Sequence, residues 1–486
     1  MTIGQVAAID LGATSGRVVL ANVGTDTAGK DVLELEVAVR FPNEPLRLWN
    51  GSRAALHTDV PALFGHVSRG LADLSRRSTD LVSIAVDSWA VDYGLLRDGR
   101  LLGLPHHYRD ERAARGVTLV ESVVDRAELF ARNGLQFLPF TTLYQLAVDR
   151  ADGVLDLADR ALLIPDLIGY WLTGIEATEH TNASTTGLFG TDGTRDTALF
   201  DRLGLASSLF ADVIEPGSVL GRVLPGVVDG CQDVAVSVVG SHDTASAVAA
   251  VPMDPDTSAY ISCGTWGLVG VETRAPLVHE RTRAAGFTNE AGVDGRTRLL
   301  HNVMGLWLLS ESVREWSVQD GEAVDLPELL AAAAQCPSSS LVFDADDDTF
   351  LPRGDMPARI GRWYRERGLE VPASRVETVR AIIDSLAAAF ARSVRDAAAV
   401  SGIDVRRVHV VGGGAQNALL CRAIADQLGL PVFAGPVEAT AIGNVLIQGR
   451  THGLIGGDLE RLRDTVASAF PPQRYDPSPR HGSRTA

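Results

Sequence analysis

Short apolar runs alternate with polar turns and with amphipathic stretches along the whole chain. The short runs, many of them bounded by glycine or acidic residues, are typical of β-strands. They predict strands over residues 6–10, 17–21, 33–41, 82–86, 235–239, 259–262, 268–272, 408–411 and 432–434. Apolar residues at helical spacing predict helices over residues 61–74, 244–251, 376–400 and 417–427, with further amphipathic helices between 117 and 175. This alternation predicts an α/β fold.

One strand–turn–strand pattern occurs twice. Gly12 lies in the turn of the first copy, and Gly264 lies in the turn of the second copy, about half the chain later. The 486 residues are enough for two or three domains, and two prolines within residues 252–255 indicate a hinge. We therefore expect two related domains, residues 1–250 and 251–470. The remaining residues, 471–486, are rich in Pro, Arg and Ser and are expected to be disordered.

The composition is acidic, with 61 Asp and Glu residues against 44 Lys and Arg residues and a net charge of −17. Such a surface repels DNA, RNA and anionic membranes, because their binding depends on cationic contacts with phosphate. Lys30 is the single lysine of the chain. A Schiff-base enzyme, or a phosphate site built around a lysine, would therefore have to use Lys30.

The cysteines and the N-terminus exclude further classes of protein. Cys231, Cys263, Cys336 and Cys421 lie far apart in the sequence and form no CxxC pair. Neither a zinc site nor a disulfide scaffold is therefore expected. The N-terminus has no basic region, and no apolar run is long enough to span a membrane. We expect a cytoplasmic protein without a signal peptide.

The sequence around Lys30 resembles a phosphate-binding P-loop only in part. Gly24 and Gly29 have the P-loop spacing, but Asp31 stands where a Ser or Thr binds magnesium. An acid at that position would repel phosphate, so a polar hairpin is the favoured interpretation. We expect Lys30→Arg to leave turnover unchanged.

Asp10 ends the first strand, and the turn after it is rich in glycine and hydroxyl residues. Its backbone N–H groups and the hydroxyls of Thr14 and Ser15 suit a phosphate chain, and Arg17 adds one fixed charge. Asp10 itself suits Mg²⁺ held through water. An ordinary hairpin turn explains residues 10–17 equally well, but the second copy of the turn favours phosphate binding, because two such turns can hold one phosphate chain.

Three consecutive glycines, residues 412–414, lie between a predicted strand and a predicted helix. Without side chains they allow another backbone or an adenine nucleotide to approach closely. A turn that starts the helix is the alternative. The position between strand and helix favours the ligand.

Asp243 also lies at a junction between a strand and a helix, after Ser241 and His242. Neighbours in sequence cannot form a Ser-His-Asp relay, because that relay is assembled in space. An aspartate at this place suits a general base that accepts the proton of a hydroxyl group. A helix N-cap is the alternative role.

Two polar stretches have the composition of sugar-binding sites. Residues 87–92 place two acids and Trp89 at the end of a predicted buried strand, and a sugar favours such a mixture of acceptors and an apolar face. The pair His301–Asn302 precedes an apolar stretch, residues 303–307, that we predict to be helical. A loop with a partly buried tryptophan is the alternative for the first stretch.

Taken together, these motifs resemble the FGGY family of carbohydrate kinases. The resemblance rests on the phosphate turn at 10–17, SHDTASA at 241–247, SCGTW at 262–266, VVGGGAQN at 410–417 and VEATAIGN at 437–444. Within the family, the stretches DLGATSGRVVLA, DSWAVDYGLL, HHYRD, QFLPFTTLYQL, HNVMGLWLLSE and AGPVEATAIGN resemble the members that phosphorylate L-rhamnulose. The match extends in the same order from residue 6 to about residue 450.

The resemblance implies a two-domain, actin-like (ribonuclease H-like) ATPase fold that binds ATP and a sugar in the cleft between its domains, with Mg²⁺ as cofactor. Sugar binding and the first phosphate turn are expected in the N-terminal domain, with the catalytic base near its end, and nucleotide binding is expected in the C-terminal domain. It further implies that Asp243 is the general base for the C1 hydroxyl of the sugar, and that Asp10 helps to place Mg²⁺. The residues that it assigns to the sugar are Ala90, through its backbone, and His242, Asp243, Thr244 and Asn302. Those that it assigns to the nucleotide are Ala13, Thr14, Ser15, Gly16, Arg17, Thr265, Ser310 and Gly413.

The expected reaction is phosphorylation of L-rhamnulose to L-rhamnulose 1-phosphate in L-rhamnose catabolism, by a monomer or homodimer. Two residues depart from the pattern: Ala90 stands where glycine is usual, and Ser310 stands where glutamine is common. Both bear on specificity more than on the class of reaction. The alternatives are a kinase for another ketose (L-fuculose, L-xylulose or a pentulose) and a non-catalytic actin-like nucleotide-binding protein.

Overall fold

The computed structural model describes residues 3–78, 80–338 and 342–479, and the chain divides into two compact units. The first unit consists of Met1–Pro252, Glu272–Leu299 and Glu438–Phe470. The second consists of Met253–Val271, Leu300–Val437 and Pro471–Ala486. Each unit therefore contains segments that are far apart in the sequence. In the described part of the chain, no helix has the length and hydropathy needed to cross a membrane.

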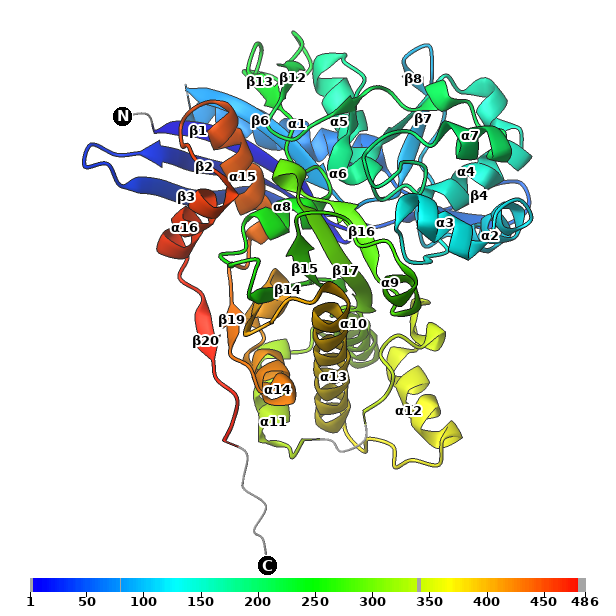
Figure 1. The fold of residues 1–486 in the computed structure, drawn as a ribbon, viewed down its shortest axis with the longest axis vertical. Coiled ribbons are helices and arrows are strands. Elements are labelled where there is room, and N and C mark those ends of the chain that lie inside the picture. The colour runs from blue at the N-terminus through cyan, green and yellow to red at the C-terminus, as the bar shows by residue number, and fades with distance from the viewer. Residues whose placement is uncertain (1–2, 79, 339–341, 480–486) are drawn as a thin grey trace, which may run out of the picture. The chain divides into compact units, whose positions relative to one another are not determined.

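The first unit is built on a sheet with the strand order β12-β13-β6-β1-β2-β3 (Figure 1). Its strands are β1 Gly4–Leu11, β2 Ser15–Thr25, β3 Asp31–Pro42, β6 Leu81–Ser88, β12 Val219–Arg222 and β13 Ala235–Ser237. β1, β6 and β13 run parallel, whereas β2 is antiparallel to β1 and to β3. The carboxyl ends of the three parallel strands therefore meet at one edge of the sheet, which is where ligands bind in sheets of this kind.

Helix α1 (Val60–Arg77) covers one face of this sheet together with α5 (Ile164–Thr173). Asp59 begins α1 by accepting a hydrogen bond from the N–H of Ala62, and Pro61 fits its first turn. The apolar residues of α1 recur every three or four positions and pack on Ile9 and Val18 of the sheet. The helix predicted over residues 61–74 is therefore confirmed.

Two helices cross closely beside the sheet. α15 (Ala439–Thr451) packs on β1, β2 and β6 and against α8 (Asp243–Ala249). A Cβ atom at Gly443 would lie 1.8 Å from the carbonyl oxygen of Ser246, so only glycine allows this crossing. The contact fixes the helix that begins with Asp243.

The first unit also contains a second apolar core, around Leu143, Phe189 and Phe200. The remaining strands of this unit are β4 Leu46–Trp49, β5 Ala54–His57, β7 Tyr93–Arg97, β8 Arg100–Leu101, β9 Arg160–Leu163, β10 Thr178–Glu179, β11 Val213–Ile214 and β16 Thr288–Ala291. Its remaining helices are α2 Ala113–Glu121, α3 Arg126–Asn133, α4 Thr142–Ala151, α6 His180–Ala183, α7 Thr197–Leu203, α9 Glu280–Ala284 and α16 Leu459–Ala469, with 3-10 turns η1 Val154–Leu157, η2 Ser207–Leu209 and η3 Val293–Gly295.

The second unit is built on six strands of a seven-stranded sheet, in the order β17-β15-β14-β18-β19-β20. Its strands are β14 Ser258–Cys263, β15 Trp266–Thr273, β17 Thr297–Met304, β18 Arg407–Val411, β19 Val432–Ala434 and β20 Gln473–Tyr475. Its helices are α10 Trp307–Asp320, α11 Leu326–Gln335, α12 Met356–Glu366, α13 Arg375–Ser401 and α14 Ala418–Leu428, with 3-10 turns η4 Asp348–Phe350 and η5 Gly413–Gln416. The long helix α13, predicted over residues 376–400, begins at the N-cap Ser374 and ends before Gly402, whose φ of 76° is left-handed.

Two predictions of local structure are wrong. Residues 301–304 belong to strand β17, and the helix begins only at Trp307. A short apolar run fits a buried strand as well as a helix, and Gly305 ends the strand where a Cβ atom would lie 2.5 Å from the carbonyl carbon of Trp266. The tail expected to be disordered contains β20, which pairs with β19. Residues 480–486 of that tail lie outside the described residues.

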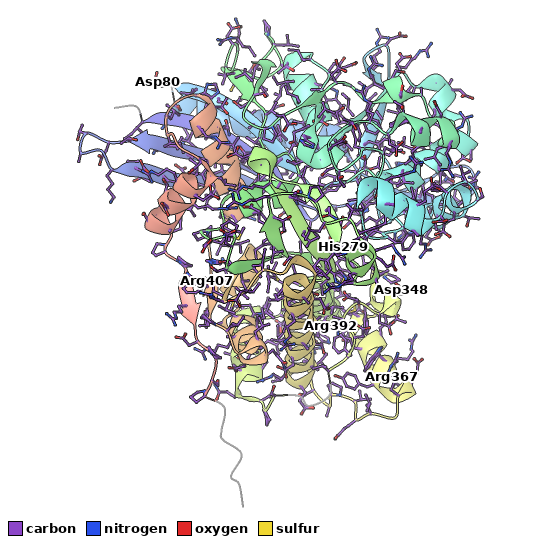
Figure 2. All side chains as sticks on the ribbon, in the orientation of Figure 1. Asp80, His279, Asp348, Arg367, Arg392 and Arg407 are labelled. Carbon is purple, nitrogen blue, oxygen red and sulfur yellow. The ribbon has the colours of Figure 1, made fainter. Side chains whose placement is uncertain are left out.

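The acidic loop at 344–348 is held in place by contacts with β17 and α13. Asp346 accepts a hydrogen bond from the backbone N–H of Met304 at 2.7 Å. Arg392 of α13 lies 3.8 Å from Asp344, and Asp348 begins η4 (Figure 2). The loop thus fixes the end of β17 within the second unit.

Candidate active site

Three carboxylates lie at the carboxyl edge of the first sheet. Asp10 and Asp87 are aligned partners on the parallel strands β1 and β6. β13 leads to Asp243, the first residue of α8, and the N–H of Ser88 donates to the carbonyl of Ser241 at 2.9 Å, which ties this segment to the end of β6. The sequence predicted roles for Asp10 and Asp243, and the structure adds Asp87 to the same edge.

Asp10 is buried and paired with an arginine. The Nε of Arg17 donates to Oδ2 of Asp10 at 2.8 Å, and the same guanidinium contacts Glu438. Burial raises the pKa of the Asp10 carboxyl above its ordinary value, although Arg17 favours the charged form. The charge of Arg17, expected from the sequence to face phosphate, is thus shared with two carboxylates. In the turn between these residues, the N–H of Gly12 donates to the carbonyl of Ser15 at 2.9 Å.

Asp87 is fully buried, and only one of its two oxygens has a protein partner. Oδ2 accepts a hydrogen bond from Nδ2 of Asn444 at 2.6 Å, and Gln448 donates to Asn444 in turn at 2.7 Å. Oδ1 is buried and has no hydrogen-bond partner among the described residues. Burial, and after it the charge of Asp10, raise the pKa of Asp87 well above its ordinary value. A buried carboxylate oxygen of this kind can accept a hydrogen bond from a water or contact an ion.

These acids do not form a complete metal cage. Within residues 3–78, 80–338 and 342–479, no group of three or more His, Cys, Asp or Glu side chains could hold a metal ion by itself. Magnesium, however, usually keeps several waters and is held by one or two carboxylates together with the phosphates of a substrate. The buried, unpartnered oxygen of Asp87, next to Asp10, fits a hydrated magnesium ion that arrives with a nucleotide.

Asp243 is the most exposed of the three acids, with 28% of its side chain accessible. The hydroxyl of Thr244 donates to Oδ1 at 3.1 Å, and Nε2 of His242 lies 3.5 Å from the same oxygen. In the described part of the chain, no hydrogen bond reaches Oδ2. One carboxylate oxygen is therefore oriented by the protein, and the other is free to accept a proton.

His242 connects Asp243 to a buried ion pair. Its Nδ1 lies 3.1 Å from NH2 of Arg298 and 3.2 Å from Oε2 of Glu290. NH1 of Arg298 lies 3.0 Å from the same Glu290 oxygen, and the arginine side chain is fully buried. Burial alone would raise the pKa of Glu290, but the charge of Arg298 holds that pKa below its ordinary value. Sequence reasoning missed both residues, because nothing near them in the sequence indicates a site.

Glu179 holds the segment that carries His242 and Asp243. Its Oε2 accepts hydrogen bonds from the backbone N–H of Ser241 at 3.1 Å and from the hydroxyl of Ser241 at 2.7 Å. The N–H of His242 donates to the hydroxyl of Thr181 at 3.3 Å, and Thr181 also donates to Glu179. Glu179 was likewise not predicted, because no local motif surrounds it.

The stretch 87–92 is more internal than its composition indicates. The indole N–H of Trp89 donates to Asp92 at 3.0 Å, and both side chains are buried. These two residues are thus bonded to each other in the interior, and sugar binding by this stretch stays a prediction. Ala90 between them is partly exposed, and Val91 has a left-handed φ of 70°, which is rare for a β-branched residue. The hydroxyl of Thr142 and Nε2 of Gln145 both donate to the carbonyl of Val91, at 2.9 and 3.2 Å, and so hold this turn.

Asp92 belongs to a hydrogen-bonded network rather than to an open site. The N–H of Tyr108 donates to it at 3.2 Å, in addition to Trp89. Burial raises the pKa of Asp92 to about 7, despite these donors. The network fixes the shape of the loop that contains Ala90.

In the second unit, the turn at Thr265 and the glycine triplet meet at one edge of the sheet, because they follow the parallel strands β14 and β18. A Cβ atom at Gly412 would lie 3.0 Å from the carbonyl oxygen of Cys263, and one at Gly414 would lie 2.4 Å from its Sγ. At Gly413 the same carbonyl would be 4.0 Å away. Gly412 and Gly414 thus allow the chain to pack closely on Cys263. Of the three glycines, Gly413 leaves room for a ligand.

The start of α10 lies on the turn at Thr265. The N–H groups of Leu306 and Trp307 donate to the carbonyls of Gly264 and Thr265 at 2.9 and 3.3 Å. Ser310 lies one helical turn further on and is exposed. Thr265, Ser310 and Gly413 are therefore all found in the second unit, where Asn302 lies on β17.

The four cysteines are free, and Cys263 and Cys421 are buried. Burial raises the pKa of the Cys421 thiol to about 12 and raises that of Cys263 as well. Neither thiol is therefore a nucleophile at neutral pH.

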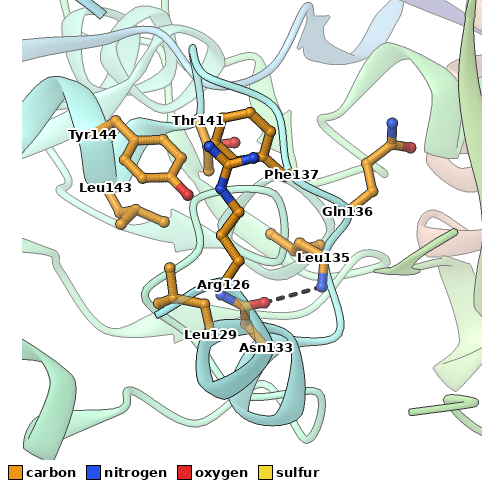
Figure 3. A pocket seen from close by; sticks show the side chains of 9 residues that line it. All are labelled: Arg126, Leu129, Asn133, Leu135, Gln136, Phe137, Thr141, Leu143 and Tyr144. Atoms are coloured by element: carbon orange, nitrogen blue, oxygen red, sulfur yellow. Dashed lines mark hydrogen bonds between the residues drawn. The ribbon is translucent and has the colours of Figure 1, made fainter. Parts of the chain in front are cut away.

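A separate, small and partly open pocket in the first unit is lined by residues of α3, of α4 and of the segment between them (Figure 3). The guanidinium of Arg126 stacks over the ring of Phe137, 3.5 Å from its centre. The side chain of Asn133 accepts a hydrogen bond from the N–H of Leu135 at 2.9 Å, as the dashed line shows. None of the site residues expected from the sequence lines this pocket.

Two family models match the chain in succession. Residues 5–250 match the N-terminal domain of the FGGY family of carbohydrate kinases, and residues 259–452 match the C-terminal domain of that family. A curated relative from Bacteroides thetaiotaomicron, named rhamnulokinase, is 38% identical over 476 residues, which are 97% of this chain and 95% of the relative. The rhamnulokinase of Pectobacterium carotovorum is 38% identical over 481 residues, which are 98% of this chain and 94% of the relative.

Solved structures share the fold at lower identity. A ligand-bound xylulose kinase from Lactobacillus acidophilus matches with a TM-score of 0.75 and 19% identity, over 98% of this chain and 94% of that chain. Plasmodium falciparum glycerol kinase with ADP matches with a TM-score of 0.74 and 14% identity, over the same shares of the two chains. The two-domain α/β fold of the actin-like ATPases, expected from the sequence, is confirmed.

Proposed function

Because the chain belongs to the FGGY family of carbohydrate kinases, we propose that it transfers the γ-phosphate of ATP to the C1 hydroxyl of L-rhamnulose, giving L-rhamnulose 1-phosphate and ADP. As a member of this family, the chain is a sugar kinase that phosphorylates an alcohol. The choice of sugar is supported by full-length relatives named rhamnulokinase. A role in L-rhamnose catabolism follows from that choice.

The observation that carries the proposed mechanism is the free oxygen of Asp243. Oδ2 accepts the proton of the C1 hydroxyl while the sugar oxygen forms a bond to the γ-phosphorus. The bond from that phosphorus to the β–γ bridging oxygen breaks, and ADP leaves with the electron pair. Thr244 holds Oδ1 at 3.1 Å, so the carboxylate presents Oδ2 in a fixed direction. Positioning of this kind accounts for much of the rate in phosphoryl transfer.

The remaining roles follow the family pattern. His242, Thr244, Asn302 and the backbone of Ala90 bind the sugar together with Asp243. The residues proposed for ATP are Ala13, Thr14, Ser15, Gly16, Arg17, Thr265, Ser310 and Gly413. Asp10 is proposed to hold magnesium through water, with the unpartnered oxygen of Asp87 beside it. Bound magnesium neutralises charge on the phosphates.

The proposal is tested by measuring ADP release with a panel of ketoses: L-rhamnulose, L-fuculose, L-xylulose, and D- and L-ribulose. We expect kcat/KM to be highest for L-rhamnulose. A higher value for another ketose would replace the proposed substrate within the same reaction class, and it would implicate the methyl group of Ala90 in specificity. Binding of ATP without ketose-dependent ADP release would overturn the proposed activity.

A further inference from the structure

Resting on the proposed role of Asp243, we infer that the buried Glu290–Arg298 pair is a positioning device that keeps His242 as the tautomer protonated at Nε2, with this N–H facing Asp243. Neither Glu290 nor Arg298 touches Asp243. They act through the imidazole ring of His242, which lies between the ion pair and the carboxylate.

The tautomer follows from the donors and acceptors around Nδ1. NH2 of Arg298 lies 3.1 Å from Nδ1, and a guanidinium group has N–H donors but no acceptor. A hydrogen bond between these two atoms therefore requires Nδ1 to be the acceptor and to carry no proton. The second hydrogen of NH2 goes to the carbonyl of Ala291 at 3.0 Å, and Nε of Arg298 donates to the same carbonyl at 3.1 Å. The guanidinium plane is thus fixed independently of the histidine.

Glu290 stabilises the buried guanidinium of Arg298, and it is also the acceptor that would favour the tautomer protonated at Nδ1. Its Oε2 lies 3.0 Å from Arg298 and neutralises a guanidinium that is fully buried, which without a partner would be strongly destabilising. The same oxygen lies 3.2 Å from Nδ1 of His242 and would accept a hydrogen bond from a protonated Nδ1 if Arg298 were absent. Arg298 therefore decides between the two neutral tautomers.

The consequence reaches Asp243 through Nε2. A neutral imidazole has one N–H group, so a proton excluded from Nδ1 is carried by Nε2. Nε2 lies 3.5 Å from Oδ1 of Asp243, the oxygen that also accepts the hydroxyl of Thr244. Two donors then face Oδ1, and Oδ2 remains available to the sugar hydroxyl. The opposite tautomer would turn a lone pair of Nε2 toward the carboxylate and repel it.

A purely structural role explains the pair less well. Replacement of a buried ion pair by apolar side chains of similar volume is often neutral or stabilising, so such a pair is weak evidence for stability. Arg298 is 0% exposed and Glu290 is 8% exposed, and both are directed at a histidine next to the proposed base. Wrong selection of a tautomer is known to be costly where a histidine acts beside a reacting group.

The direct test is NMR of the free wild-type protein labelled with ¹⁵N-histidine, with His242→Asn to assign the resonance. We expect a neutral His242 at pH 7.5 whose protonated nitrogen is Nε2, identified by two-bond couplings to both carbon-bound ring protons. A protonated Nδ1, in either a neutral or a charged ring, would overturn the inference. The experiment needs no substrate, so its outcome is independent of the proposed activity.

Variants test whether Arg298 causes this state. In Arg298→Met we expect the proton to move to Nδ1, where it faces Glu290, and kcat to fall about 10- to 100-fold with the KM for ATP unchanged. Arg298→Lys keeps a cationic donor and should retain the Nε2–H tautomer and more of kcat than the methionine variant. An unchanged tautomer in Arg298→Met would contradict the inference, even if activity were lost.

Arg463→Met is the matched control for loss of a buried guanidinium. Arg463 is 2% exposed and pairs with Glu272 in the same unit, with Nη–O distances of 3.0 and 2.7 Å. We expect this variant to lose thermal stability to a similar extent, but to keep the wild-type tautomer of His242 and the wild-type kcat. If the two methionine variants reduced kcat equally, the effect of Arg298 would be structural, and the inference would fail. If no ketose were phosphorylated while the wild-type tautomer was as stated, the proposed function would fail instead.

Discussion

The β1–β2 hairpin of the first unit and the β14–β15 hairpin of the second share one pattern of pairing. Each first strand is antiparallel to the strand that follows it and parallel to a third strand, β6 or β18. The last pairs are also equivalent, since Leu11 faces Gly16 and Cys263 faces Gly267. In both turns, the glycine after the first strand donates its N–H to the carbonyl of the residue that begins the second strand. The repeated pattern predicted from the sequence is therefore a repeated structure.

The chemistry at the equivalent positions differs. Asp10 aligns with Arg17 and with Asp87 in the first unit. The corresponding residue of the second unit, Ser262, aligns with Leu268 and Val411. Charge is therefore concentrated at the edge of the first sheet, whereas the second edge offers hydroxyl groups and bare backbone. The roles proposed for Asp243 in proton transfer and for Gly413 in contact with ATP follow this difference between the two edges.

Asp243→Asn should have the largest effect, because it removes the proton acceptor from the charged unit. We expect turnover to fall about 10²- to 10⁴-fold while the folded protein still binds the sugar. Steady-state kinetics with sugar binding by calorimetry check this. Lys30→Arg is a matched control at an exposed turn of the same unit and should keep wild-type turnover. Near wild-type turnover in Asp243→Asn would remove the proposed base.

Gly16→Ala and Gly267→Ala test whether the hairpins are equivalent. A Cβ atom at Gly16 would lie 2.3 Å from the ring of Phe41, and one at Gly267 would lie 2.4 Å from the ring of Phe390. Overpacking of this kind costs about 1 to 3 kcal/mol of stability. We expect both variants to lower the melting temperature by similar amounts. A loss in only one of them would show that the likeness between the hairpins does not extend to packing.

Asp92→Asn tests how the buried carboxyl group of Asp92 changes the pH dependence of the free energy of unfolding. The pKa of Asp92 is raised from 3.8 to about 7 by burial, so the folded protein keeps a proton that the unfolded chain releases between these values. Stability is therefore lost as the pH rises through this window, with a slope approaching about 1.4 kcal/mol per pH unit for one proton. Denaturant unfolding from pH 4 to 8 should show a weaker decline in the variant. Parallel curves for the two proteins would mean that Asp92 is charged throughout.

Gly413→Ala has the smallest expected effect and concerns the second unit. Stability should change by less than about 0.5 kcal/mol, because the new methyl group meets no close atom. We expect the KM for ATP to rise roughly fivefold, which is about 1 kcal/mol of binding. Gly414→Ala is the contrasting control, since its methyl group would meet Cys263 and destabilise the fold. Unchanged kinetics in Gly413→Ala would argue against contact between this glycine and ATP.

The sequence predicts best what depends on neighbouring residues. Asp10 lies near the end of the short apolar strand β1, which Gly12 follows, and Asp243 begins the helix that comes after β13. These local signals were enough to predict the fold class and to name candidate residues at the ends of the strands. The helix predicted at 303–307 failed because a short apolar run does not distinguish a strand from a helix.

The support for the site depends on contacts that no local pattern records. Arg298 meets His242 across 56 residues of sequence, and Glu179 meets Ser241 across 62. The indole N–H of Trp89 donates to Asp92 in the interior of the protein. Composition alone does not reveal this contact. Long-range hydrogen bonds of this kind follow from the topology of the sheet, so they become visible only when the strands are in place.

The most direct test of the account follows the product of the reaction itself. Wild-type protein and Asp243→Asn are incubated with ATP, magnesium and L-rhamnulose labelled with ¹³C at C1, and the product is observed by ¹³C NMR. The account predicts that the C1 resonance becomes coupled to phosphorus with the wild type and that this product is nearly absent with the variant over the same time. Phosphate on another carbon, or equal product from both proteins, would contradict it.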